Sequence, residues 1–69
     1  MSASTKLKEF IKRNHITRPY LSKLIDININ TLHNKFARDN FEANDLIKIA
    51  EVMGYKLAFV KDGETFILE

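Results

Sequence analysis

The chain has 69 residues, 45% of them hydrophobic, and a formal net charge of +2. This length allows one small core, so residues 1–69 are expected to form a single domain. The lack of cysteine excludes disulfides and thiolate metal sites, and the longest apolar run, Leu57 to Val60, is far too short to span a membrane.

The first apolar stripe predicts a helix over Ser4–Asn14. Leu7, Phe10 and Ile11 are three and four positions apart, so a helix places them on one face. The pair Asn14-His15 is expected to end this helix, because asparagine tolerates the left-handed conformation found at helix ends.

Two short helices follow, and both have the same N-terminal pattern. Thr17 is expected to cap a helix over Arg18–Ile25, and Asn28 is expected to cap a helix over Ile29–Ala37. Only residues 26–28 connect them, and so short a turn makes the two helices cross sharply.

A fourth helix and a change of period complete the chain. The helix is predicted over Ala43–Met53, with Gly54 as its C-terminal stop. From residue 55 the apolar residues alternate, and Asp62-Gly63 between two β-prone runs is the strongest short-range hairpin signal. The predicted fold class is therefore mainly α, with four to five short helices over residues 4–54 and a C-terminal β-hairpin over residues 55–69.

The two faces of the hairpin predict different surroundings. A two-residue turn pairs Phe59 with Phe66 and Leu57 with Leu68, and this face, together with Tyr55, is expected to join the core. We expect the second face to form a homodimer interface, because it is too apolar to be left in water and because an isolated hairpin is marginally stable. The residues of the second face are Ala58, Val60, Thr65 and Ile67. The alternative is that this face packs on the protein's own first helix.

The stretch from Arg18 to Phe36 has the form of a helix-turn-helix. It combines two short helices, a three-residue turn and a small residue, Ser22, at the point where the second helix must approach closely. That second helix would enter the major groove of DNA. Its outward polar residues suit the hydrogen-bonding edges of bases, although an ordinary solvated helix face looks the same. These residues are Asn30, His33 and Asn34.

On these residues the chain resembles the lambda-repressor-like (Xre/Cro type) helix-turn-helix domains of bacteria and their phages. The resemblance runs from about Lys6 to Leu57. It is carried by Thr17–Asn28, by Thr31-Leu32 and by Leu46–Gly54. The chain departs from the family pattern at Asp26, where glycine is common, and at Ser22, where alanine is usual.

The resemblance implies sequence-specific binding of double-stranded DNA by a transcriptional regulator that occupies an operator. By position, base contacts are expected from Asn28, Ile29, Asn30, His33 and Asn34. Phosphate contacts are expected from Arg18, Thr31, Lys35 and Arg38. Related Cro proteins dimerise through C-terminal strands, which favours a homodimer on a palindromic operator here.

The charges are unevenly distributed along the chain. Residues 1–38 contain eight Lys or Arg and two acidic residues, whereas residues 39–69 contain three Lys and seven acidic residues. A basic first half favours a polyanionic partner, although charges that only solvate a small protein are the simpler alternative.

Other function classes find little support in the sequence. His15 and His33 fall on different elements without metal-ligand spacing, and no glycine-rich phosphate loop or nucleophile–base order is present. We therefore expect no enzymatic activity, metal, cofactor or small-molecule ligand. The N-terminal residues lack a signal-peptide core, which fits a cytoplasmic protein. The alternative function is a protein-interaction module that keeps the helix-turn-helix fold without binding DNA, and Asp26 favours it weakly.

Overall fold

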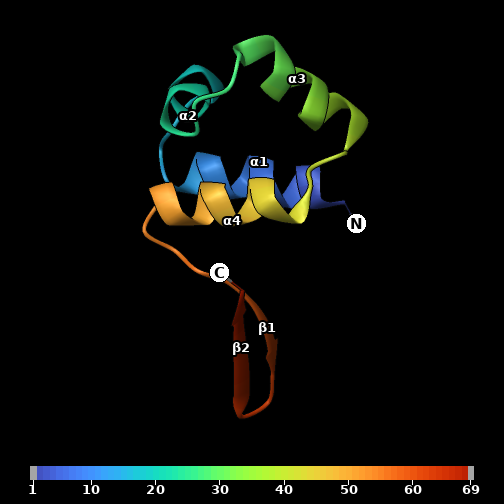
Figure 1. Cartoon of the computed structure of the whole chain (residues 1–69), viewed down its shortest axis with the longest axis vertical. Coiled ribbons are helices and arrows are strands. Elements are labelled where there is room, and N and C mark those ends of the chain that lie inside the picture. Colours follow the sequence, from blue (N-terminus) through green and yellow to red (C-terminus); the bar gives the residue numbers. More distant parts are fainter. Residues whose placement is uncertain (1, 69) are drawn as a thin grey trace.

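Four helices and a two-stranded hairpin follow one another in the computed structural model, which describes residues 2–68 (Figure 1). They are α1 (Ala3–Arg13), α2 (Arg18–Leu24), α3 (Ile29–Arg38), α4 (Ala43–Val52), β1 (Leu57–Lys61) and β2 (Glu64–Leu68). The mainly α class with a C-terminal hairpin is therefore confirmed, and the predicted helix bounds agree to within one residue. Among the described residues, no helix has the length and apolar character that a membrane crossing requires.

Side-chain caps start the helices where the sequence predicts. The Thr17 hydroxyl accepts a hydrogen bond from the Tyr20 N–H (3.3 Å), and the Asn28 side-chain oxygen accepts one from the Asn30 N–H (2.7 Å). Each such cap contributes about 1 kcal/mol to helix stability. Because the two caps lie eleven positions apart in one short segment, they determine where both helices of the helix-turn-helix begin.

Three non-glycine residues in the described chain adopt the left-handed conformation after helices, namely His15 (φ 59°), Asp26 (φ 56°) and Asp39 (φ 53°). Asp26 does so in the turn between α2 and α3. The predicted stop at Asn14-His15 is confirmed, but the left-handed residue of the pair is His15 and not Asn14, whose φ is −88°. The Asn14 amide instead donates to the Phe10 carbonyl (2.9 Å), and the left-handed turn falls on His15.

One core joins all four helices. Its buried members are Leu7, Ile11, Leu21, Ile25, Leu32, Phe36 and Ile49. Leu21, Leu32 and Ile49 are at most 2% exposed, and burial of each such side chain stabilises the fold by about 1.5–3 kcal/mol. Since α2 and α3 each contribute to this core, their outer sides are held in a defined orientation.

The hairpin lies at the opposite end of the long axis from α2 and α3 (Figure 1), in a molecule that measures 39 × 24 × 21 Å. The antiparallel register is the predicted one, with Leu57 opposite Leu68, Phe59 opposite Phe66 and Lys61 opposite Glu64. The chain enters the hairpin through Gly54, which has the left-handed φ (79°) expected of a helix stop.

The prediction that the Phe59–Phe66 face belongs to the core is wrong. Phe59 is 68% exposed and Phe66 is 66% exposed, and Tyr55 is exposed as well. Only Leu57 and Leu68, at the base of the hairpin, are half-buried. The physical reason is that the hairpin extends away from the helices (Figure 1), which leaves both phenylalanine side chains largely in solvent.

The second face of the hairpin is also in contact with solvent. Val60 is 74% exposed, Ile67 is 45% exposed and Thr65 is exposed, whereas Ala58 is half-buried. This face therefore does not pack on α1, which was the alternative to a dimer interface. Both faces of the hairpin together form an unusually apolar surface for a small domain.

Candidate nucleic-acid interface

The turn between α2 and α3 is held by short-range hydrogen bonds around Ser22. The Ser22 side chain is buried, and its hydroxyl donates to the Pro19 carbonyl (2.8 Å). The Ser22 carbonyl in turn accepts from the Ile27 N–H across the turn (3.0 Å). Serine at this position thus finds a hydrogen-bond partner for its buried hydroxyl within α2, and it is small enough for α3 to pack against the same helix.

The outer side of α3 presents a row of polar side chains. Asn30, Thr31, His33 and Asn34 are exposed, as is Asn28 at the cap. The carbonyl oxygen of the Asn28 side chain is used by the cap, so its NH2 group is the part that faces outward. Ile29 is half-buried and packs against the core, which turns part of its side chain away from solvent.

Arg18 is held against α3 by two contacts. Its guanidinium carbon lies 4.2 Å from the centroid of the Phe36 ring, a cation–π distance, and its Nη1 lies 3.1 Å from His33 Nδ1. Phe36 is buried and meets Phe41 edge-on, with 5.0 Å between the ring centroids. The side chain expected to contact phosphate is therefore part of a stack that joins the start of α2 to the middle of α3.

Lys35 is directed towards α4. Its ammonium group lies 2.9 Å from the Asp45 carboxylate, and the two side chains are 21% and 27% exposed. Burial raises the pKa of Asp45, but hydrogen bonds from the Glu42 N–H and Lys35, with the charges of Lys35 and Lys48, outweigh it and lower the pKa. A phosphate contact by Lys35 would have to replace this ion pair.

The cations of the helix-turn-helix outnumber its acids. Arg18, Lys23, Lys35 and Arg38 lie between the start of α2 and the end of α3, where Asp26 is the only acid. Arg38 and Lys23 are exposed, and both lie in the last turn of their helix. Lys23 was not among the expected phosphate contacts, although its place at the end of α2 was evident from the sequence.

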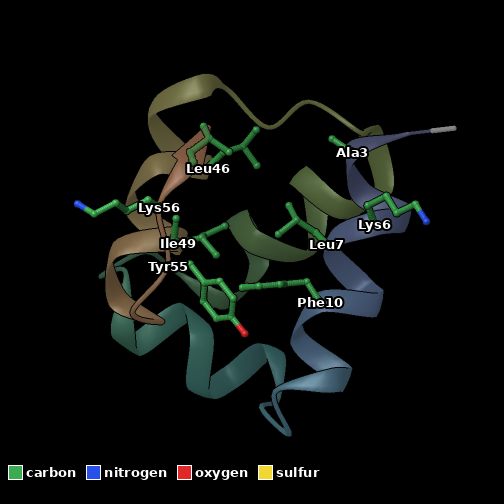
Figure 2. Close-up of a pocket in the computed structure, with 10 residues that line it drawn as sticks. Ala3, Lys6, Leu7, Phe10, Leu46, Ile49, Tyr55 and Lys56 are labelled. Carbon is green, nitrogen blue, oxygen red and sulfur yellow. The ribbon is translucent and has the colours of Figure 1, made fainter. Parts of the chain in front are cut away.

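An apolar groove of about 370 Å³ lies outside the helix-turn-helix, between α1, α4 and the segment that leads to the hairpin (Figure 2). Phe10 and Tyr55 meet edge-on inside it, with 4.8 Å between ring centroids. The Tyr55 hydroxyl donates to the Asn14 side-chain oxygen (3.3 Å), which ties the start of the hairpin to the end of α1.

Within residues 2–68, no three His, Cys, Asp or Glu side chains come together as metal ligands. Comparison with protein-family models, with curated proteins and with solved structures finds no match for this chain.

Proposed function

We propose that this protein binds double-stranded DNA sequence-specifically through α3 and regulates transcription in the cytoplasm by occupying an operator. The observation that carries the proposal is the exposed polar side of α3, which the core, the two caps and the Asp26 turn hold in a defined orientation. An isolated helix with these residues would be an ordinary solvated surface. A helix packed across a second short helix, with cations at its flanks, has the geometry of a major-groove reader.

Each part of the interface has a chemical role in this proposal. The amides of Asn30 and Asn34 can each make paired hydrogen bonds to adenine, and the His33 ring can meet a base edge beside them. Asn28 contributes its NH2 group and Ile29 contributes apolar contact at the start of the helix. The proposed phosphate contacts are Arg18, Thr31, Lys35 and Arg38.

The hairpin completes the proposal as the contact between two copies of the chain. One helix-turn-helix reads few base pairs, whereas a two-fold dimer reads two half-sites about 34 Å apart on a palindromic operator. The exposure of Val60 and Ile67 supports this role, because a second copy would remove both side chains from water. The proposed interface comprises Ala58, Val60, Thr65 and Ile67.

A second candidate function is protein binding without DNA. The observation that favours it is that Lys35, one of the four expected phosphate contacts, is ion-paired with Asp45 within the protein. Asp26 adds an exposed acid beside the proposed DNA surface. In this case α3 would be a solvated or protein-binding surface.

Selection of binding sites from random duplexes at about 0.15 M ionic strength separates the two functions. DNA binding predicts an enriched palindromic sequence. It also predicts that replacing both Asn30 and Asn34 by Ala lowers the preference for that sequence by about 1–3 kcal/mol per lost contact. Asn44→Ala is the matched control, because Asn44 is exposed on α4 and should leave the preference unchanged. An unenriched pool would contradict the proposal.

A further inference from the structure

The contact between Arg18 and His33 determines which hydrogen-bonding group of the histidine faces outward. An arginine side chain has only donors, so the ring nitrogen that meets Arg18 Nη1 at 3.1 Å must accept. That nitrogen is Nδ1, and a neutral ring with an accepting Nδ1 carries its proton on Nε2. His33 is exposed, so Nε2 is the ring nitrogen left to meet another molecule, and it is a donor.

Arg18 is placed to hold this arrangement by more than one contact. The guanidinium carbon lies 4.2 Å from the centroid of the buried Phe36 ring, so the side chain does not have the freedom of an ordinary surface cation. The guanidinium has five N–H donors, and the bond to His33 uses one of them. A phosphate contact by the same side chain is therefore compatible with the bond to the histidine.

From this geometry we propose that Arg18 is a positioning residue that fixes His33 as a hydrogen-bond donor towards DNA, so that His33 favours guanine over cytosine. The inference rests on the proposed function. In the major groove guanine presents two adjacent acceptors, O6 and N7, whereas cytosine presents the donor N4–H2. A donating Nε2–H matches guanine and is mismatched to cytosine. The opposite tautomer would reverse this preference.

The first test uses the free protein and needs no DNA. Long-range nitrogen–proton NMR spectra at about pH 8, where neutral imidazole predominates, report the tautomer of each histidine. We expect the nitrogen chemical shifts of His33 to be those of a single tautomer, with a protonated Nε2 and an unprotonated Nδ1 whose shifts lie far apart. In Arg18→Ala the two shifts should move towards each other, while those of His15, an exposed histidine at the end of α1, stay unchanged. Identical His33 shifts in both proteins would overturn the proposal.

The second test measures the preference for guanine over cytosine at one base pair of the selected site. This base pair is identified with His33→Ala, which should abolish the preference there. Arg18→Ala should lower the guanine-over-cytosine ratio there by about fivefold, the worth of one hydrogen bond. Arg18→Met should lower it as much, because methionine keeps an unbranched side chain over Phe36 but has no N–H to donate to His33. In the double variant Arg18→Ala/His33→Ala, loss of Arg18 should cause no further change in the ratio.

Arg38→Met and Arg38→Ala are the matched controls, since Arg38 is an exposed cation of α3 with a proposed phosphate role. They should change the affinity for all duplexes and leave the ratio alone. If Arg18→Met kept the ratio of the wild type, Arg18 would be a phosphate contact only. If no duplex were enriched, the proposed function and the base preference would both fail, and the NMR spectra would still decide whether Arg18 positions His33.

Discussion

The Asp39 carboxylate accepts a hydrogen bond of 2.9 Å from the backbone N–H of Ser4, thirty-five residues earlier in the chain. Asp39 follows the last turn of α3, and Ser4 lies in the first turn of α1. The carboxylate thus satisfies a free amide of α1 and places a negative charge at the positive end of that helix. The bond ties the end of the proposed recognition helix to the N-terminal helix.

Replacing Asp39 by Asn should make the stability of the protein less dependent on pH in acid. Two groups of Ser4 lower the pKa of Asp39. The first is the Ser4 hydroxyl, which lies nearby without meeting hydrogen-bond geometry, and the second is the Ser4 N–H, which donates to the carboxylate. A lowered pKa in the folded state stabilises the fold above the unfolded pKa, and this contribution is lost as pH falls through the folded value. Asparagine keeps an acceptor and tolerates the left-handed φ.

Urea unfolding followed by circular dichroism between about pH 6 and pH 2 measures this effect. Wild type should be more stable than Asp39→Asn at the upper end of the range, and the difference should shrink towards the lower end. A constant difference across the range would mean that the Asp39 charge contributes nothing to the Ser4 contact.

Two substitutions of Asp26 should change stability in opposite directions. Glycine has no Cβ to clash at φ 56°, so Asp26→Gly should raise the free energy of unfolding by about 0.5 kcal/mol. Alanine lacks the short polar side chain that tolerates this conformation, so Asp26→Ala should lower it by about 1 kcal/mol. Both variants remove the same charge, and denaturant midpoints compare them directly. Equal shifts in one direction would assign the effect to charge and not to the backbone.

The helix starts and the hairpin register could be predicted because their causes are local. Thr17 and Asn28 cap amides two or three positions away, and the Asp62-Gly63 turn determines which residues of the two strands pair. The end of α1 at Asn14-His15 was also predictable, but not which of the two residues takes the left-handed conformation. The Asn14 side-chain amide donates to the Phe10 carbonyl, and His15 makes the turn.

The contacts between elements could not be predicted in this way. The stack of Arg18 on Phe36 and the ion pair of Lys35 with Asp45 depend on how the helices cross. Spacing along each helix does not determine that crossing. The alternation of the hairpin likewise tells which residues share a face but not what covers the face, and Phe59 was assigned to the core for that reason.

Replacing Asp45 by Asn should release Lys35 for phosphate. The variant loses the ion pair but keeps an oxygen that can accept from the Glu42 N–H, so the free energy of unfolding should fall by less than about 1 kcal/mol. Affinity for every duplex should rise, and the magnitude of the salt slope should increase by about one. Asp62→Asn is the control, because it removes the same charge from the hairpin turn at the far end of the molecule. A gain of equal size in the control would show a general charge effect.

The last prediction concerns the homodimer. In the described chain, each strand of the hairpin pairs only with the other, so both outer strand edges are open. The side chains of Val60 and Ile67 face solvent. A second copy that covers this face would bury apolar surface at about 25 cal/mol per Å² and could also pair with an open strand edge. Sedimentation at micromolar concentration should therefore give a mass near twice 8.0 kDa.

Ile67→Lys should be monomeric and should still fold, because Ile67 is 45% exposed in the single chain and a lysine there has access to water. Circular dichroism checks the fold. Phe66→Lys is the matched control on the opposite face, where the side chain is 66% exposed, and it should remain dimeric. The reverse result, with Phe66→Lys monomeric and Ile67→Lys dimeric, would move the interface to the Phe59–Phe66 face. A wild type that stays monomeric both free and on its selected DNA would exclude the hairpin dimer altogether.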